Sequence, residues 1–230
     1  HGFTSDQAGT YCIGCEADNW GMATVTKFGF NLSVSASYCV GCYAHNCGVG
    51  GYGFVLSATP PTFINCIATS CAKSGFYQAT ATITNQAYLF GCVAYGNTER
   101  GLFLAGTTAN RTIVLNNCIF YGNTGAGIAS NASGNGSVEL LGCAFGSNGG
   151  GDIADTTVQE TIPRVTLTAD PFVDAANGDF RLAASQRQAL STGWPGAFLR
   201  NGALTAWAGY PDLGAVQQAV RPTSIFVEAA

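Results

Sequence analysis

The chain has 230 residues, of which 47% are hydrophobic and 10% are charged, and its formal net charge is −4. The charged share lies well below the quarter or so that is usual in globular domains. No cluster of Lys and Arg is present to neutralise phosphates, which argues against nucleic acid as a partner. No apolar run approaches the roughly 18 residues of a membrane span, so we expect no membrane association.

A cysteine returns along the chain at intervals of 27, 24, 26, 26 and 25 residues. The six members of this column are Cys15, Cys42, Cys66, Cys92, Cys118 and Cys143. A period near 25 residues, with short apolar runs between Gly and Asn corners, indicates one supersecondary unit stacked on its own copies. The residue before each cysteine is Gly or Asn, which predicts a sharp corner with φ above zero.

The residue two positions after each cysteine is Ala or Phe. Side chains alternate along a strand, so this residue and the cysteine share one face. Because both residues are apolar, we expect that face to point inside. We therefore expect the six cysteines to form an internal column of unbridged thiols. Neighbours stacked in register point parallel to one another, which disfavours disulfides between them.

After each cysteine strand the chain continues through a Gly-rich turn into a second short strand. These strands read GFVLSA (53–58), GFYQAT (75–80), GLFLAG (101–106), GIASN (127–131) and DIAD (152–155). A polar bend and a third apolar run, such as TIVLN at 112–116, lead to the next cysteine. Helix signals are nearly absent. Three short strands per coil of about 25 residues predict an all-β parallel solenoid, with coils over 1–160 and closing coils and a tail, packed on the same solenoid, over 161–230.

Residues 169–217 leave the repeat and contain DPFVDAANGDFRLAA and PDLGAVQ. This segment resembles the closing coils of right-handed parallel β-helix proteins of the pectate-lyase-like group, which occur in bacterial surface and secreted proteins and in bacteriophage virions. It departs from them where many relatives carry a Ser-Pro-Ala-(Ile/Leu)-Asp run, because this chain reads SQRQALSTG. The resemblance implies a right-handed β-helix with an irregular closing segment. It implies no particular activity, since enzymes, adhesins and virion parts share the fold.

Cys12-x-x-Cys15 and Cys39-x-x-Cys42, with His45 and Cys47 close by, have the spacing of a zinc site. The repeat offers a simpler interpretation, because Cys12 and Cys39 fall in the column that holds Phe or Leu in the other copies, and we expect no metal. Disulfides Cys12–Cys39 and Cys47–Cys71 remain open, since stacked strands lie within bridging distance. The GxGxxG at 48–53 is followed by strand residues rather than a helix, so we expect no cofactor.

The positions one and three after each cysteine should face outward. Their titratable members are Glu16, Asp18 and His45, all near the N-terminal end. A glycosidase needs two carboxylates about 5–10 Å apart, and the middle copies offer none at these positions, which favours a non-catalytic protein over an enzyme. The middle copies instead carry an apolar and aromatic stripe, whose members are Tyr43, Ile67, Val93, Tyr95, Ile119 and Tyr121.

We expect this stripe to bind a protein partner, either copies of the chain or virion proteins. Two alternatives stay open: part of residues 185–210 folds over the stripe, or the stripe binds carbohydrate. An unbridged cysteine column suits folding in a reducing cytoplasm. The expected function is thus a structural or binding β-helix protein, namely a capsid-decorating or tail-associated bacteriophage component assembled in the host cytoplasm. The alternative is a secreted or surface carbohydrate-active β-helix protein (a polysaccharide lyase or hydrolase) or an adhesin, located extracellularly or on the cell surface.

Overall fold

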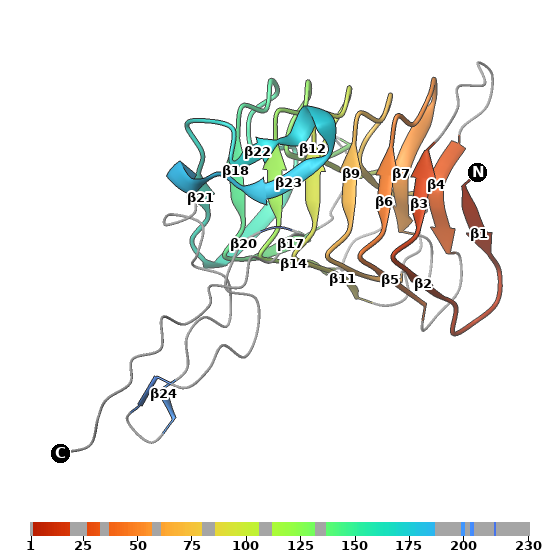
Figure 1. The fold of residues 1–230 in the computed structure, drawn as a ribbon, viewed down its shortest axis with the longest axis horizontal. Helices are drawn as coiled ribbons and strands as arrows, with labels where there is room; N and C mark the ends of the chain where they lie inside the picture. Colours follow the sequence, from red (N-terminus) through yellow and green to blue (C-terminus); the bar gives the residue numbers. More distant parts are fainter. Residues whose placement is uncertain are drawn as a thin grey trace.

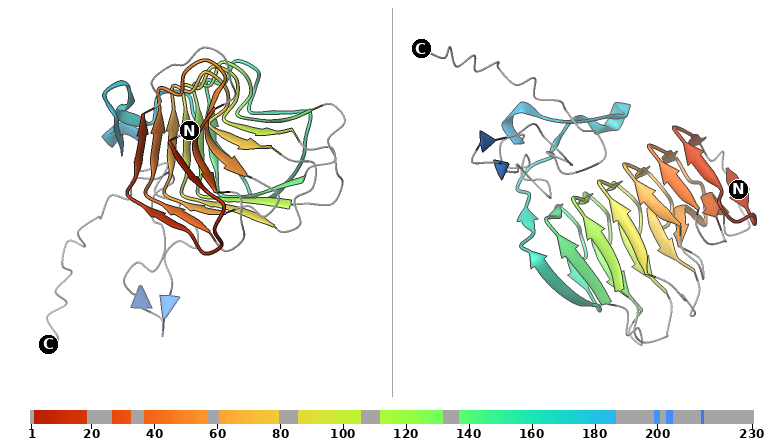
Figure 2. Two further views of the ribbon diagram at one scale, coloured as in Figure 1. Left: turned by 90° about the vertical axis from the view of Figure 1, so that its right-hand side faces the viewer. Right: turned by 90° about the horizontal axis from the view of Figure 1, so that it is seen from below.

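Three parallel β-sheets run the length of the molecule and enclose one interior, as the computed structural model shows (Figures 1 and 2). The structure describes residues 2–18, 27–32, 37–56, 61–79, 86–105, 112–131 and 137–186, together with 199–200, 203–204 and 214. Each of the three sheets has seven strands, and successive strands of one sheet come from successive coils. The predicted all-β parallel solenoid, with three short strands in each coil of about 25 residues, is confirmed.

The sheets are named here in the order in which the chain first enters them. Sheet A contains β1 (Phe3–Ser5), β4 (Lys27–Leu32), β7 (Gly51–Leu56), β10 (Phe76–Gln78), β13 (Leu102–Leu104), β16 (Ile128–Ser130) and β19 (Ile153–Ala154). Sheet B contains β2 (Tyr11–Ile13), β5 (Tyr38–Val40), β8 (Thr62–Ile64), β11 (Ala87–Phe90), β14 (Thr112–Asn116), β17 (Ser137–Leu141) and β20 (Thr157–Ile162). Sheet C contains β3 (Glu16–Asp18), β6 (Tyr43–His45), β9 (Ile67–Thr69), β12 (Val93–Tyr95), β15 (Ile119–Tyr121), β18 (Ala144–Gly146) and β21 (Val165–Thr166).

Two further pairs of strands follow the coils. β22 (Phe172–Asp174) and β23 (Asp179–Leu182) form an antiparallel hairpin around the short 3-10 helix η1 (Ala175–Asn177). β24 (Leu199–Arg200) pairs with β25 (Ala203–Leu204). The expected boundary at residue 160 falls inside β20, and β21 still belongs to sheet C, so the regular coils continue to residue 166.

The corner between sheets B and C has the left-handed backbone that the sequence predicts. All six residues that precede the column cysteines have φ between 52° and 67°, and they are Gly14, Gly41, Asn65, Gly91, Asn117 and Gly142. A second left-handed corner follows each sheet C strand in five coils, at Asn46, Ser70, Gly96, Gly122 and Ser147. Only Gly, and to a lesser degree Asn and other small polar residues, adopt this conformation at low cost. The two corners turn the chain abruptly, which allows three-residue strands to enclose an interior.

The column cysteines point into that interior, and all ten cysteines of the chain are free thiols. Five of the six column cysteines are at most 1% exposed, and Cys15, in the first coil, is half-buried. Each buried thiol donates to a carbonyl of the preceding coil, for example Cys66 Sγ to the Cys39 oxygen at 3.3 Å and Cys118 Sγ to the Leu89 oxygen at 3.4 Å. Burial raises the pKa of the Cys92 thiol, so it remains protonated and able to donate.

An asparagine ladder supports the second corner in the later coils. Asn123 Nδ2 donates to the Ala94 carbonyl at 3.2 Å and to Asn148 Oδ1 at 2.9 Å. Asn97 Nδ2 donates in the same way to the Ala68 carbonyl and to Asn123 Oδ1. The ladder occupies the column five residues after the cysteine, which holds Cys47 and Cys71 in earlier coils; Trp20, its first member, lies outside the described residues. These buried amides are satisfied by one another, so they do not destabilise the core.

Replacing Cys92 by Asp tests the interior column. The variant places a carboxyl group, charged or protonated, where two carbonyl acceptors, those of Phe63 and Phe90, and apolar neighbours surround the thiol. We expect a loss of more than about 4 kcal/mol in the free energy of unfolding, measured by thermal or urea denaturation. Cys15→Ser, at the half-buried end of the column, is the control and should cost less than about 1 kcal/mol. A Cys92→Asp variant that melts like the parent would contradict the inward placement of this column.

Candidate functional site

The outer face of sheet C is covered in part by the hairpin β22–β23, which crosses it from the C-terminal side (Figure 1). Phe172 and Phe180 pack with their ring centroids 5.1 Å apart, and both contact the ring of Tyr95 at 5.7 Å. Val93 and Ile119 are fully buried beneath this segment. A second apolar core therefore lies outside the solenoid, and the chain itself provides both of its sides.

A partner-binding stripe was expected from Tyr43, Ile67, Val93, Tyr95, Ile119 and Tyr121, and the chain itself covers part of it. Within one chain, Val93 and Ile119 have no exposed surface and Tyr121 is 9% exposed. Among the described residues, the stripe is covered by segment 167–182 together with Gly214. Residues 187–198, 201–202 and 205–210 lie outside the described part of the chain. The apolar pattern of Val93, Ile119 and Tyr121 thus reflects contacts within the chain, whereas Tyr43, Ile67 and Tyr95 are only partly buried.

Gly214, from the PDLGAVQ segment, is seated at the same face. Its backbone N–H donates to the Asn117 carbonyl at 2.6 Å, at one of the left-handed corners. A Cβ placed on Gly214 would lie 2.9 Å from Ile119 Cδ1 and 3.2 Å from Val93 Cγ2, and its φ is +89°. Both the backbone conformation and the close approach require glycine here.

The N-terminal half of the stripe is not sealed but borders a pocket. The pocket lies between sheet C and the hairpin tip and has a volume of about 330 Å³. Its wall on sheet C contains Tyr43, His45, Asn46, Thr69, Ser70 and Tyr95, and its other wall is the η1 turn, Ala175 to Gly178. This volume is in the range of small-molecule sites, and we take the pocket as the candidate site.

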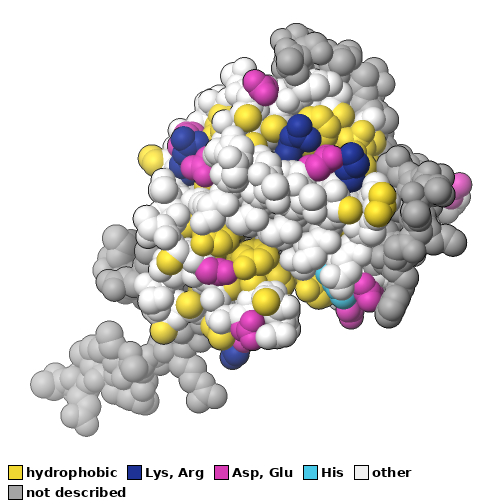
Figure 3. All heavy atoms as spheres, turned by 90° about the horizontal axis from the view of Figure 1, so that it is seen from above, with side chains coloured by type: hydrophobic (Ala, Val, Ile, Leu, Met, Phe, Trp, Pro, Cys, Tyr) yellow, Lys and Arg dark blue, Asp and Glu magenta, His cyan; other side chains and the backbone are white. Residues whose placement is uncertain are grey.

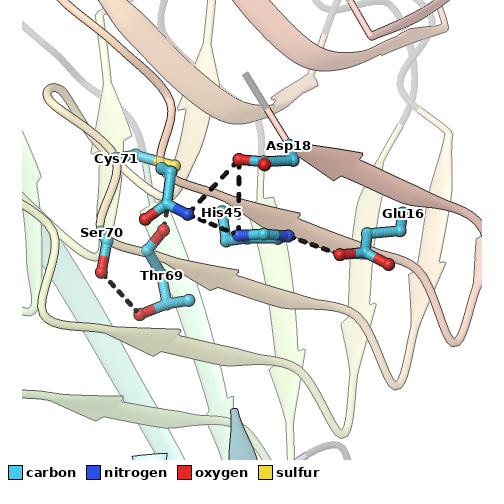
Figure 4. Close-up of polar contacts among 7 residues, drawn as sticks. Glu16, Asp18, His45, Thr69, Ser70 and Cys71 are labelled. Carbon is cyan, nitrogen blue, oxygen red and sulfur yellow. Dashed lines mark hydrogen bonds and ion pairs between the residues drawn. The ribbon is translucent and has the colours of Figure 1, made fainter. Parts of the chain in front are cut away.

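Three residues singled out from the sequence, Glu16, Asp18 and His45, come together at the edge of this pocket (Figure 4). His45 Nε2 lies 2.7 Å from Glu16 Oε1. His45 Nδ1 lies 2.9 Å from Asn46 Nδ2 and 3.6 Å from Asp18 Oδ1. Figure 3 shows the histidine beside acidic side chains on this face. The three come from β3 and β6, whose residues pair as Glu16 with Tyr43 and Asp18 with His45.

The hydrogen bonds of His45 limit what it can do chemically. The Asn46 amide nitrogen can only donate, so His45 Nδ1 accepts and Nε2 carries the proton that is donated to Glu16. Both ring nitrogens are thus engaged within the cluster in this structure. No group of three His, Cys, Asp or Glu residues in the described part of the chain is arranged to hold a metal ion. The cluster is suited to fixing the orientation of Asn46 and the imidazole at the pocket.

Two tyrosines connect the pocket to the hairpin. The Tyr95 hydroxyl donates to Asp170 Oδ2 at 2.6 Å, and burial together with this bond raises its pKa, so it remains a donor throughout the neutral range. The Tyr43 ring stacks on the His45 ring at 4.3 Å and meets the edge of Phe180 at 6.1 Å. The Tyr43 ring thus contacts both the cluster and the hairpin, whereas Tyr95 contacts the hairpin.

A second hollow lies at the corner between sheets C and A, with a volume of about 440 Å³. Its rim includes Glu99, Arg100 and Asp155, and its floor contains Ala129 and Ala154. Glu99 pairs with Lys73 at 2.5 Å, and the Arg100 guanidinium lies 4.2 Å above the Phe103 ring. Glu99 and Arg100 already have partners within the chain, so this hollow is the weaker candidate.

The comparisons with known proteins agree with the architecture. The family model described as "Right handed beta helix region" matches residues 2–162. The chain belongs to the right-handed β-helix family. The match covers all of the coils up to the end of β20, and it ends before the hairpin that forms one wall of the pocket. No curated protein and no solved structure gave a match. None of the described helices is long and apolar enough to cross a membrane.

Sequence reasoning found the Glu16, Asp18 and His45 cluster but missed the pocket beside it. The contributions of Asn46, Thr69 and Ser70 were not anticipated, nor was that of the η1 turn. A signal did exist, because Asn46 and Ser70 both occupy the left-handed corner after sheet C. Where such a corner is Asn or Ser rather than Gly, it exposes a short polar side chain at a fixed place in the coil. The opposing wall carried no comparable signal, since it comes from a segment outside the repeat.

Replacing Phe180 by Ala tests whether the hairpin is held by its aromatic contacts. Phe180 is 2% exposed, and truncation of such a residue costs about 3–5 kcal/mol, more than an isolated two-stranded hairpin can sustain. We expect hydrogen-exchange protection to be lost at 172–182 while amides of β12 and β15 keep theirs. Val173→Ala, at an exposed site on the same hairpin, should leave protection unchanged. Retained protection in Phe180→Ala would contradict this account of the docking.

The engaged state of His45 gives a prediction about activity. No turnover of a polysaccharide by this protein should depend on Glu16, Asp18 or His45, because these groups are bonded to one another. Reducing-end release and the absorbance of unsaturated products would be followed for the parent and for Glu16→Gln, Asp18→Asn and His45→Gln. Cleavage that disappears in any of the three would overturn the non-catalytic interpretation. Glu16→Gln should cost less than about 1 kcal/mol of stability, since the Glu16 side chain is 64% exposed.

Proposed function

We propose that this protein is a non-catalytic structural and binding β-helix protein, and that it serves as a bacteriophage virion component of the capsid-decorating or tail-associated kind. The observation that carries the proposal is the interior column of free thiols. All ten cysteines are unbridged, and nine of them are buried. A chain with ten thiols that passes unfolded through an oxidising compartment is exposed to mispairing, whereas assembly in a reducing cytoplasm avoids it.

The candidate site supports the non-catalytic part of the proposal. Its one histidine and two nearby carboxylates form a closed set of hydrogen bonds. Apart from His45, the groups that line the pocket are hydroxyls, amides, alanine methyls and backbone, which bind ligands but do not transfer protons efficiently near neutral pH. The parallel solenoid adds a long and rigid scaffold on which such a site can be held.

Thiol accessibility tests the carrying observation. We expect at most one thiol per chain, Cys15, to react rapidly with Ellman's reagent in the native state, and ten to react after denaturation without reductant. Protein directed to an oxidising compartment should instead yield fewer than ten free thiols and a lower recovery of folded material. Ten free thiols and full recovery after oxidative export would remove the argument for cytoplasmic assembly.

The virion role has a separate test. Material from the native source, separated on a density gradient and probed with an antibody to the chain, should contain the protein in the particle fraction. Detergent and high salt should leave most of it attached. Protein found only as a free species would contradict the proposal and favour a secreted or surface β-helix protein.

A further inference from the structure

We infer that the pocket between sheet C and the hairpin binds a neutral sugar residue of a glycan. The inference rests on the proposed binding role and names its ligand class. Three features of the pocket carry it: the kind of groups that line it, the absence of fixed charge among them, and the wall that the hairpin contributes. Each feature limits the chemistry of the occupant.

The polar groups on the sheet side include both donors and acceptors of hydrogen bonds. Thr69 and Ser70 present hydroxyls, 3.4 Å from each other. Asn46 presents its amide oxygen, because its Nδ2 is already bonded to Asp18 and His45. The η1 turn adds a second amide, Asn177, which donates to Asp174 Oδ2 at 2.7 Å and so has its carbonyl oxygen turned to other partners. A sugar hydroxyl is likewise donor and acceptor at once, so a ring with several hydroxyls can satisfy this set.

None of the residues that line the pocket carries a fixed charge. A phosphate or carboxylate ligand would need Lys, Arg or a helix N-terminus, and no Lys or Arg lines the pocket. An ammonium ligand would seek an acidic side chain, but Glu16 and Asp18 are already engaged by His45 and Asn46. The other hollow of the molecule differs in this respect, since Glu99, Arg100 and Asp155 line it. The pocket is therefore matched to an uncharged polar ligand.

The pocket also has apolar surface of the right kind. Ala175, Ala176 and Gly178 form the hairpin wall, and Tyr43 and Tyr95 add aromatic surface on the sheet side. A sugar presents C–H groups between its hydroxyls, and these would lie against the wall. The volume of about 330 Å³ accommodates one ring of a chain whose other residues extend into solvent.

The experiment uses the full chain on an array of printed neutral and acidic glycans, followed by calorimetric titration with a neutral glycan that binds. Ser70→Gly removes a hydroxyl and Asn46→Gly removes an amide, and both positions have φ near 50°, which glycine adopts freely. Each should weaken binding about tenfold, as expected for the loss of one or two hydrogen bonds. Ala176→Trp, at an exposed position on the η1 wall, should fill the pocket and abolish binding.

Two variants serve as matched controls. Ser147→Gly makes the same change at the equivalent corner of a later coil, where φ is 53°, and Val173→Trp adds the same ring at an exposed site on the hairpin away from the pocket. Both should bind like the parent. Circular dichroism melts show whether each variant is folded. If Ala176→Trp does not fold, the binding measured for Ser70→Gly tests the inference.

Three outcomes would overturn the inference: no neutral glycan binds, only acidic glycans bind, or binding survives both Ala176→Trp and Ser70→Gly. These failures are distinct from a failure of the proposed function. Protein that resides in particles but binds no glycan would contradict the ligand assignment alone. Protein that binds a neutral glycan in this pocket but is absent from particles would contradict the virion role alone.

Discussion

Every level of this structure depends on the in-register stacking of parallel coils. Strands of only two to six residues are held because each one pairs with the coil before and the coil after. Such short strands have no stability by themselves, so the coils must turn at the same places. The left-handed corners before the cysteines and after sheet C fix those places. These corners require small, uncharged side chains, which accounts for the abundance of Gly and Asn and for the low charge of the sequence.

Stacking in register brings like residues together, and the interior shows how that constraint is met. A column of buried thiols is tolerated because each one donates to a carbonyl of the preceding coil, and a column of amides because each asparagine bonds to the next. Aromatic rings follow the same rule, and Phe30, Phe54 and Phe76 stack 4.9 and 5.1 Å apart. A residue in such a column must pack against, or hydrogen-bond with, the residue at the same position in the next coil. A carboxylate cannot do this, which explains its absence from the described interior columns.

The features that follow from the repeat were predictable, and those that join the repeat to another segment were not. The cysteine corner, the inward column and the strand at 112–116 can be read from residues that recur at fixed spacing. The apolar stripe on sheet C was equally visible in the sequence. The same pattern is expected whether a second chain or another segment of this chain covers the stripe. Contacts such as Tyr95 with Asp170 join residues 75 positions apart. Nothing in the local sequence of either segment specifies that pairing, so the hairpin and the pocket emerge only from the folded structure.

The hairpin gives the otherwise uniform solenoid a single distinct position. A stack of similar coils offers the same surface repeatedly, and the hairpin breaks that repetition. Here the break has two causes: the outward residues change from Val93 and Ile119 to His45 and Glu16 toward the N-terminal end, and the hairpin ends above that transition. Where the outward side chains are apolar, the hairpin packs closely on them. Where they become polar, it cannot pack without burying unsatisfied groups, and the space between the two surfaces remains open as the pocket.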